Sequence, residues 1–534
     1  MAAPGGLWSA AAADEHETGH SALSRLLTPM ATSTLTSFAR AGEVVRLSHA
    51  LSTTQIDKMK LHVWMVVAAM VSGGWARVVP LEQAPYARSA VAPALEPRAG
   101  SYANAVESAL HNRIARHIRP DYSPLSKRQA AADNGAITNF GSSPPQPVRG
   151  SKGAPFLHGS NTDIDRQNVD YLSPPPTDAG TVPNLKWAFS LSKSKLLNGG
   201  WVREQVVTDL PASKEVAAAE QRLAPYAYRE LHWHRVAEWG LVLNGTVRIT
   251  ANDEEDRNYV ADANKGDLWS LPRGVPHTLQ AGPEGAQYLL VFDDGDFDAS
   301  GTTFAVDDWI AHTPRDVLAE NFGWNISAFS SVPAADPYIV PAAQGEQWLP
   351  IQDARKQVDA NPAGEVESPY VYRLSQQNKT QAPGGGGWVK VTDYRRFAAS
   401  PTLASAYVHV QKGGLRELHW HKNAEWGYIV KGKARATAFA GGATARTFDL
   451  QQGDTWVFPT NYGHYIQNVG DEELEFVEIF RAPNFGEKVR FDDFSLTQWL
   501  ALVPPSVAAK QLNVSQHLVE QLSSKKQIIV AAQT

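Results

Sequence analysis

The hexapeptide RELHWH occurs twice in this chain of 534 residues, at positions 229–234 and again at positions 416–421. Each copy begins a set of three histidines and one glutamate, and a constant offset of 187 residues relates the two sets. The same offset relates Trp201 to Trp388 and Pro272 to Pro459, so the similarity extends beyond the sets. Such a repeat indicates that a whole domain has been duplicated. The first set is His232, His234, Glu238 and His277, and the second is His419, His421, Glu425 and His464.

The spacing within each set is typical of β-structure. Side chains alternate between the two faces of a strand, so positions 232, 234 and 238 share one face if the segment is a single strand. The fourth residue of the set must then come from another strand. We therefore predict an all-β fold in which the four side chains converge inside a barrel or sandwich. Turns are expected at Asn244-Gly245, Lys265-Gly266 and Pro272-Arg273-Gly274, and helices at 306–322 and 496–512.

The residue types in each set predict a metal site. Three neutral imidazoles and one carboxylate suit a divalent transition-metal ion, and four protein ligands around an octahedral ion leave two positions for substrate or dioxygen. A single His-x-His pair is more often solvated or hydrogen-bonded, but two complete sets at one offset favour metal binding. His312 and His409 have no ligand-like partners in the sequence and are interpreted as structural or exposed. The H-E-x-x-H match at 16–20 lies in a low-complexity segment and is not interpreted as a zinc site.

Composition excludes several classes of protein. The chain has no cysteine, so disulfides, thiolate catalysis and cysteine-ligated metals are excluded. Its net charge is −6 and no lysine-arginine stripe runs through the repeats, so we expect no nucleic-acid partner. The hydrophobic fraction of 43% is sufficient for ordinary cores. A small anionic substrate would need a local positive site, which the metals together with Arg229 or Arg416 could provide.

The N-terminal region predicts secretion. Met59-Lys60 precedes the apolar run LHVWMVVAAMVSGG, and residues 59–76 have the pattern of a signal peptide. We therefore interpret residues 1–58 as a disordered extension of the gene model, and residues 77–128, which end at a dibasic site, as a disordered propeptide. A signal-anchor helix is the rival interpretation, although the run is short for a membrane span. We expect a secreted protein with no membrane contact after signal removal. Potential N-glycosylation sequons begin at Asn244, Asn325, Asn378 and Asn513.

The rest of the chain divides around the repeat. Residues 129–185 are rich in turn formers and predict an extended arm that packs on a neighbouring domain or subunit. The first repeated domain is placed at 186–330 and a linker at 331–367. The second domain is placed at 368–534 and includes a C-terminal helix.

The motifs of the repeat resemble a known family. The pattern HWHxxxE followed by PxxxPH or PxxxGH, present twice, resembles the paired motifs of bicupins. The run from about 155 to 512 resembles the oxalate decarboxylase family, with segments such as AEWG, GDLWSLPRGVPH, LLVFDDG and DDWIAHTP. This resemblance implies two tandem cupin barrels, which are double-stranded β-helices or jelly rolls, with short flanking helices. It also implies one manganese ion in each barrel, a homo-oligomer that is usually a hexamer, and conversion of oxalate to formate and carbon dioxide with dioxygen required for turnover.

The resemblance also implies roles for individual residues. The two sets match the manganese ligands, and Arg229 and Arg416 match the arginines that hold the substrate carboxylate. The family donates a proton from a glutamate on a lid, but this chain has FDASGTTF at 297–304, where Asp298 is the only acid. The acid of the second domain is retained as Glu478.

The altered lid leaves the reaction open. Without a competent acid, the carbon-centred intermediate could be oxidised to carbon dioxide with release of hydrogen peroxide, which is oxalate oxidase chemistry. A storage or ligand-binding bicupin is a further alternative, although storage relatives typically lose metal ligands. The sequence places decarboxylation slightly ahead of oxidation.

Overall fold

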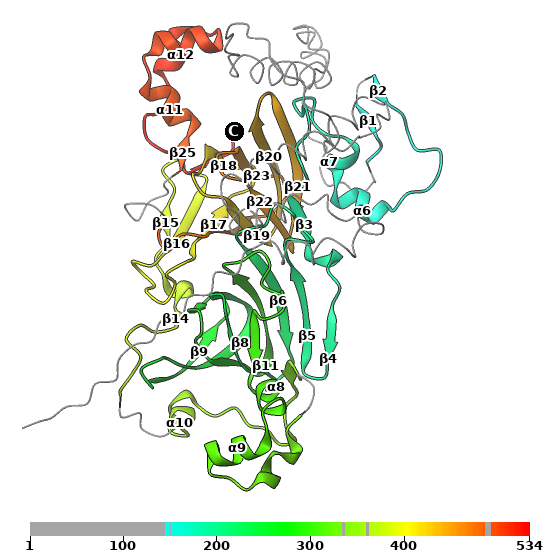
Figure 1. Cartoon of the computed structure of the whole chain (residues 1–534). Coiled ribbons are helices and arrows are strands. Elements are labelled where there is room, and N and C mark those ends of the chain that lie inside the picture. Colours follow the sequence, from blue (N-terminus) through cyan, green and yellow to red (C-terminus); the bar gives the residue numbers. More distant parts are fainter. Residues whose placement is uncertain (1–144, 150, 334–336, 359–362, 486–492, 534) are drawn as a thin grey trace, which may run out of the picture. The chain divides into compact units, whose positions relative to one another are not determined.

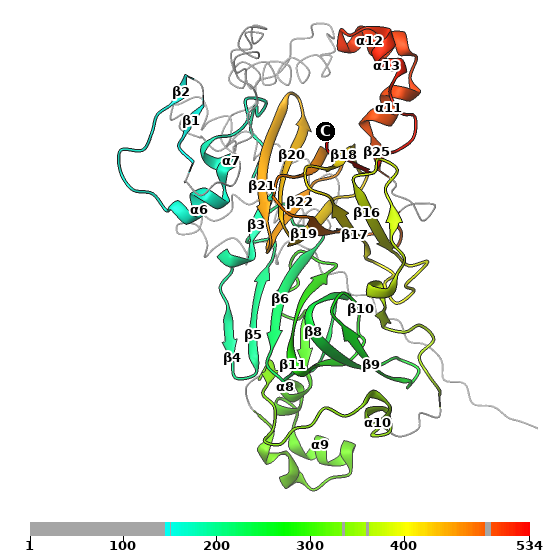
Figure 2. The same cartoon turned by 180° about the vertical axis from the view of Figure 1, so that it is seen from behind.

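The structure is a computed structural model that describes residues 145–149, 151–333, 337–358, 363–485 and 493–533. The interpretations of residues 1–58, 59–76 and 77–128, and of the first part of the arm, fall outside the described residues. Within those residues, no helix has the length and apolar character needed to cross a membrane. The described chain is predominantly β-structure with short helices, as the sequence predicts, and its two barrels follow one another in Figures 1 and 2.

The first barrel is formed around two long strands, β8 (Glu238–Asn252) and β11 (His277–Phe292), which pair with each other in two stretches. The predicted hairpin turn at Asn244-Gly245 is wrong, because this dipeptide lies inside β8 at a break in the register. Gly245 has φ +77°, and a Cβ there would lie 2.0 Å from the carbonyl oxygen of Gly285. Glycine therefore lets β8 bend from one side of the barrel to the other. The remaining strands are β4 (Lys195–Leu197), β5 (Gly200–Gln205), β6 (Ala217–Leu223), β7 (Tyr228–His234), β9 (Asn258–Asn264), β10 (Leu268–Leu271), β12 (Thr303–Ala305), β13 (Ile339–Val340) and β14 (Val371–Tyr372).

The second barrel repeats this plan with separate strands. The equivalent of β8 is interrupted at Gly432, which has φ +89°, and becomes β19 (Glu425–Lys431) and β20 (Lys433–Gly441). One sheet contains β15 (Thr380–Gln381), β16 (Gly387–Thr392), β17 (Ala404–Val410), β24 (Leu474–Phe480), β19 and β22 (Asp454–Phe458). The facing sheet contains β21 (Thr444–Gln451), β20, β23 (Gly463–Asn468), β18 (Leu415–Trp420), β25 (Phe494–Ser495) and β26 (Ile529–Val530).

Each barrel receives a strand from the sequence assigned to the other. Strand β3 (Lys186–Ala188) pairs with β22 of the second barrel, although the boundary at 186 places it in the first domain. Strand β14 pairs with β10 of the first barrel, although the boundary at 368 places it in the second domain. The two short strands therefore pair across the predicted boundaries, because pairing with a partner distant in sequence decides where they lie. The contact between the barrels is largely apolar, and Trp426 within it donates a hydrogen bond to Gln205 at 2.9 Å.

The described part of the N-terminal arm packs against the second barrel. It contains β1 (Val148–Arg149), β2 (Lys152–Gly153), α6 (Thr162–Gln167) and α7 (Val169–Leu172). The backbone N–H of Asp170 donates to Asp449 on β21 at 3.0 Å, and the backbone N–H of Thr447 donates to Asp178 at 2.9 Å. The described part of the arm therefore lies along the second barrel.

Short helices follow each barrel, and prolines determine their lengths. The predicted helix at 306–322 is two helices, α8 (Val306–Ala311) and α9 (Arg315–Phe322), separated at Pro314. The predicted helix at 496–512 is likewise divided at Pro504 into α11 (Leu496–Leu502) and α12 (Pro505–Leu512), and α13 (Gln516–Glu520) follows. Both predicted helical segments are confirmed, and each is divided near a proline, which lacks the N–H that would continue a helix. The segment predicted as a linker contains β13, which pairs with β7, and α10 (Ile351–Arg355).

Candidate metal centres

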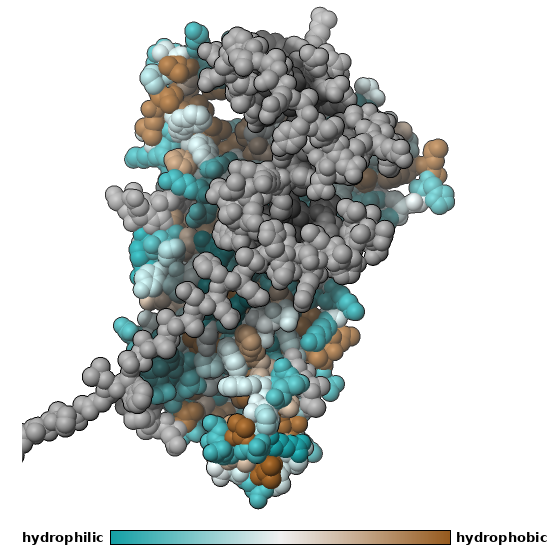
Figure 3. Space-filling model, viewed as in Figure 1, coloured by the Kyte–Doolittle hydropathy of each residue, from teal (hydrophilic) through white to brown (hydrophobic). Residues whose placement is uncertain are grey.

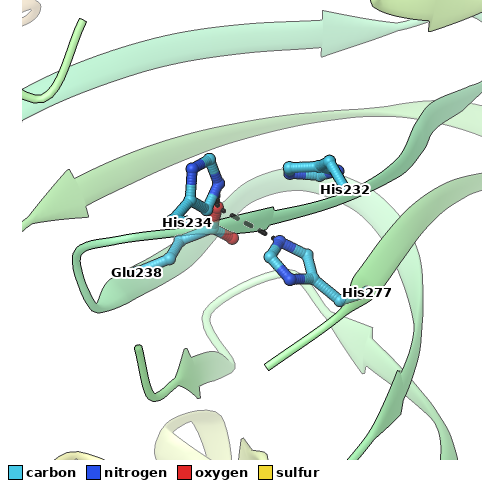
Figure 4. A group of neighbouring side chains, drawn as sticks. All are labelled: His232, His234, Glu238 and His277. Atoms are coloured by element: carbon cyan, nitrogen blue, oxygen red, sulfur yellow. Dashed lines mark ion pairs between the residues drawn. The ribbon is translucent and has the colours of Figure 1, made fainter. Parts of the chain in front are cut away.

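The first predicted set comes together inside the first barrel. His232 and His234 lie on β7, Glu238 begins β8 and His277 begins β11, and their donor atoms lie within 4.8 Å of one another (Figure 4). The prediction that 232, 234 and 238 lie on one strand is wrong, because the chain bends at 235–237. The side chain of Asp293 accepts a hydrogen bond from the backbone N–H of Ala237 at 2.9 Å and stabilises this bend. Glu238 therefore approaches from the next strand.

Hydrogen bonds orient the imidazoles of this first centre. Nδ1 of His232 lies 2.6 Å from the carbonyl of Glu230, and Nδ1 of His277 lies 2.8 Å from the carbonyl of Val275. A carbonyl can only accept, so Nδ1 carries the proton and Nε2 presents its lone pair to the centre. His232 and His277 are also direct partners across β7 and β11. The protein thereby fixes the tautomers that metal binding requires.

The second set is arranged in the same way. His419 is the cross-strand partner of His464, and their Nδ1 atoms lie 2.5 Å and 2.8 Å from backbone carbonyls. In each barrel a buried tryptophan on the neighbouring strand donates to the glutamate, over 2.8 Å from Trp269 to Glu238 and 2.9 Å from Trp456 to Glu425. These tryptophans fix one carboxylate oxygen and leave the other facing the histidines. Both donor sets are buried.

The unsatisfied atoms of both clusters fit a divalent metal ion. Glu238 Oε2 lies 3.2 Å from Nε2 of His234 and 3.6 Å from Nε2 of His277, but neither contact has hydrogen-bond geometry. Such buried and unpaired donors converging on one point are unusual unless an ion binds there. Nε2 atoms without a hydrogen-bond partner among the described residues belong to His234, His277, His419 and His421.

The protonation states also fit metal binding. Burial, with a further contribution from Arg229, holds the pKa of His232 well below its usual value, and burial lowers the pKa of His234 to about 4. Burial alone would raise the pKa of Glu238, but the nearby imidazoles of His234 and His277 lower it below its usual value. At neutral pH these groups are two neutral imidazoles and a carboxylate, which are the forms that bind metals.

The two predicted substrate arginines have different surroundings. Arg229 forms an ion pair with Glu230, donates to the carbonyl of Tyr338 at 3.1 Å, and lies 3.6 Å from the centre of the Tyr338 ring. Arg416 donates to Asp493 at 2.5 Å and to Glu478 at 3.2 Å. The guanidinium of Arg416 is thus held by the buried carboxyl groups of Asp493 and Glu478, whereas Arg229 forms its ion pair with the buried Glu230.

The two predicted proton donors also differ. Asp298 is exposed and makes no hydrogen bond or ion pair with the four side chains of the first cluster; burial within the loop and nearby Asp296 raise its pKa. The lid residue that touches the cluster is Thr303, whose hydroxyl lies 3.0 Å from Nδ1 of His234. Glu478 is fully buried, and burial, opposed by Arg416, raises its pKa to about 8. Its carboxyl group is therefore able to hold a proton at neutral pH.

Some contacts were not predicted from the sequence. His409 was interpreted as lacking ligand-like partners, but its Nε2 lies 3.2 Å from Glu473 and the pair lies close to Glu475. His312 is exposed beside Asp308, as interpreted. Neither Tyr338 nor Asp493 was identified, since Tyr338 belongs to no motif. Asp493 could have been found by aligning the two lids on Phe304 and Phe494.

Comparison with known proteins identifies the family. A family model described as Cupin matches residues 190–328 and 372–520. Oxalate decarboxylase OxdC of Bacillus subtilis (strain 168) is 44% identical over 387 residues, which cover 72% of this chain and 97% of that protein. A probable oxalate decarboxylase of Arthroderma benhamiae is 44% identical over 395 residues, covering 73% of this chain and 94% of that protein. The chain belongs to the bicupin oxalate decarboxylase family.

Solved structures of this family have the same fold. The structure of oxalate decarboxylase from Bacillus subtilis at pH 4.6 matches with a TM-score of 0.68 and 42% identity, covering 74% of this chain and all of that chain. Another structure of the Bacillus subtilis enzyme is described by its Mn(II) centres. The predicted fold class of two tandem cupin barrels is therefore confirmed.

Proposed function

We propose that this protein is a manganese-dependent oxalate decarboxylase, which converts oxalate to formate and carbon dioxide and requires dioxygen for turnover. The observation that carries the proposal is the pair of complete His₃Glu clusters, each with an arginine three residues before its first histidine. The relatives support the substrate, because they are named as oxalate decarboxylases and almost their whole length is matched. Two manganese ions per chain and dioxygen are the proposed cofactors.

The residues of the first barrel suit this reaction. Bound manganese would be held by His232, His234, Glu238 and His277 and would supply a Lewis acid and a redox partner for the oxalate carboxylate. Arg229 would bind the other carboxylate through a charge-assisted hydrogen bond. The ring of Tyr338 contacts this guanidinium, 3.6 Å from Cζ to the ring centre, and restricts its orientation. The hydrogen oxalate anion then gives one carbon dioxide and one formate, and its proton ends on the remaining carbon.

The experiment that tests the proposal is product analysis. Purified, manganese-loaded protein would be incubated with oxalate in air at acidic pH, and formate and hydrogen peroxide would be quantified together. Formate in amounts equal to the oxalate consumed, without peroxide, is the expected result. Absence of both products would contradict the proposal.

A second candidate function is oxalate oxidase, and the lid favours it. The lid carries no glutamate, and its only acid, Asp298, is exposed and not hydrogen-bonded to the cluster. Peroxide without formate would establish this alternative. If Asp298 donates the proton, Asp298→Asn should lower formate output several-fold, and Asp298→Glu should raise the ratio of formate to peroxide. The neighbouring exposed acid gives a matched control, Asp296→Asn, which should leave that ratio unchanged. Unchanged formate output in Asp298→Asn would show that Asp298 is not the proton donor and would make Glu478 the remaining candidate.

A third candidate is a storage or ligand-binding bicupin. Metal analysis of purified protein separates this class from the enzymes. Both clusters are complete and buried, which favours about two ions per chain. Well below one ion per chain would support the binding-protein alternative.

Secretion, glycosylation and assembly are also proposed. The four sequon asparagines lie at exposed positions, where a glycan can be accommodated. The helices that follow each barrel present large apolar side chains to solvent, seen as brown patches over α11 and α12 in Figure 3. Exposed apolar surface of this kind supports a homo-oligomer, proposed to be a hexamer. N-terminal sequencing and light scattering of protein secreted by an expression host would test these points. The exposed side chains on the helices include Trp309, Val317, Phe322, Trp499, Leu502 and Val507.

A further inference from the structure

The lids of the two barrels can be aligned by their strand pairing. Strand β12 places Phe304 opposite Trp233, and β25 places Phe494 opposite Trp420. In each barrel the two rings are stacked, at 5.5 Å in the first and 5.3 Å in the second. The residue before each phenylalanine is thus equivalent, and it is Thr303 in the first barrel and Asp493 in the second.

This equivalent residue is neutral in one barrel and charged in the other. Thr303 places a hydroxyl 3.0 Å from Nδ1 of His234, on the outer side of that imidazole. Asp493 places Oδ2 2.5 Å from Nη2 of Arg416 and 3.9 Å from Nε2 of His419. The Asp493 carboxylate therefore lies between the arginine and the donor face of a cluster histidine.

That position is the one that a substrate carboxylate would need. We infer that Asp493 closes the second centre by occupying, with its own carboxylate, the place in which Arg416 would hold oxalate, so that oxalate binds at the first centre only. The inference rests on the proposed function, because it takes oxalate as the substrate. Asp493 would thus determine specificity by excluding oxalate from the second centre.

Further contacts hold Asp493 in place. Lys526 forms an ion pair with Oδ1 and also donates to the backbone carbonyl of Asp493. The side chains of Arg416 and Asp493 are both fully buried. Oxalate would have to break this buried pair before it could bind, which weakens binding by a factor on the order of 10²–10³. A cavity of about 460 Å³ borders His419 and His464, but its lining is mainly apolar. It therefore offers oxalate no polar contacts that would offset the loss of the Arg416–Asp493 pair.

The first centre lacks this obstruction. The corresponding carboxylate is absent at Thr303, and Arg229 is positioned by the ring of Tyr338, whose centre also lies 4.2 Å from Nζ of Lys195. In the second barrel the residue at the place of Tyr338 is Ile528, and both have a left-handed backbone, with φ of 56° and 63°. An aromatic ring can orient the arginine without competing with an anionic substrate.

The test is the number of oxalate ions bound per chain. Manganese-loaded protein would be titrated with oxalate by calorimetry under argon, where the proposed requirement for dioxygen prevents turnover, and the metal content of each sample would be measured. The wild type should bind one oxalate per chain, and Asp493→Thr should bind two. Asp471→Asn removes an exposed acid of the same barrel and should keep the value at one. Two equal sites in the wild type, or one site in a fully metal-loaded Asp493→Thr, would overturn the inference.

The reciprocal change keeps the test decisive if Asp493→Thr does not fold. Thr303→Asp should weaken oxalate binding at the first centre by about 10²-fold or more. Thr303→Asn introduces a side chain of the same shape as aspartate but without its charge, so the loss of oxalate affinity should be clearly smaller. Equal losses in the two variants, or unchanged binding in Thr303→Asp, would overturn the inference. A wild type that binds one oxalate but makes neither formate nor peroxide would refute the proposed function and leave the inference intact.

Discussion

The two barrels contain the same four donor residues, yet the surroundings of their arginines differ. Arg229 lies against a tyrosine ring and pairs with Glu230, whereas Arg416 is fully buried between Asp493 and Glu478. The duplicated barrels have therefore kept their four donor residues, while the charged residues around the arginines have diverged. The comparison teaches that a complete set of metal ligands does not by itself make two sites equivalent, because access of the substrate depends on the residues around them.

The largest difference should appear in stability when each arginine is replaced. Arg416→Gln removes the cation that pairs with the buried Asp493 carboxylate and donates to Glu478, and we expect a loss of about 3–5 kcal/mol in the free energy of unfolding. Arg229→Gln should lower the free energy of unfolding by less. Its carboxylate partner Glu230 is the next residue in the sequence, and the ring of Tyr338 is neutral. Urea unfolding of both variants measures this difference. Equal losses would show that the two arginines have the same structural role.

The glutamates of the two clusters should separate metal binding from turnover. Glu238→Gln and Glu425→Gln should each reduce the metal content from about two ions to about one, since an amide is a poor ligand and Trp269 or Trp456 would still hold it. We expect Glu238→Gln to lower formate production by about 10²-fold or more, and Glu425→Gln to lower it less. Metal analysis and formate assays on the same samples test this. A larger loss of formate in Glu425→Gln would assign turnover to the second barrel.

Two glycines should behave alike, because they belong to the shared frame. A Cβ at Gly240 would lie 2.1 Å from the Trp269 indole, and one at Gly427 would lie 2.1 Å from the Trp456 indole. Each indole is fixed by its hydrogen bond to a cluster glutamate. Gly240→Ala and Gly427→Ala should therefore each destabilise the protein by about 1–3 kcal/mol. Thermal unfolding tests the pair, and a strongly unequal effect would mean that the frames have also diverged.

The last expected difference is a dependence of stability on pH that the second barrel contributes through Glu478. Burial raises the pKa of Glu478 to about 8 from a usual 4.5, so the folded state retains the proton over this interval. Its favourable contribution is complete below about pH 4.5 and is lost as the pH rises toward 8. The slope is at most about 1.4 kcal/mol per pH unit. Glu478→Gln should remove this decline between pH 5 and 8 in metal-free protein, whereas the equivalent position in the first barrel is the apolar Leu290. An unchanged slope would show that Glu478 is ionised.

The sequence predicted the duplicated barrels and the convergence of both donor sets because these depend on local spacing. The spacing of the donor residues, repeated at one offset, identifies them even where the ends of the strands are predicted inaccurately. Glu238 illustrates this, since it joins the cluster although it lies on β8 and not on the predicted strand. The sequence also located the helical segments after each barrel, and the structure divides them near Pro314 and Pro504.

The features that distinguish the two sites could not be predicted in the same way. The offset between the barrels is 187 for the ligands but 190 between Phe304 and Phe494, so a search at one offset does not align Asp493 with Thr303. Tyr338 lies more than one hundred residues from Arg229 in sequence, and only the pairing of β13 with β7 brings them together. Such long-range placement depends on tertiary structure and not on local pattern.

The exchange of β3 and β14 has a consequence for how the protein can be divided. Each barrel has a sheet edge that is extended by a strand encoded next to the other barrel. A protease that cut the connection between the repeats would therefore leave both fragments interlocked, and a gene encoding either repeat alone would produce a barrel with an uncovered strand edge. The two copies are thus joined by exchanged strands as well as by the chain that connects them.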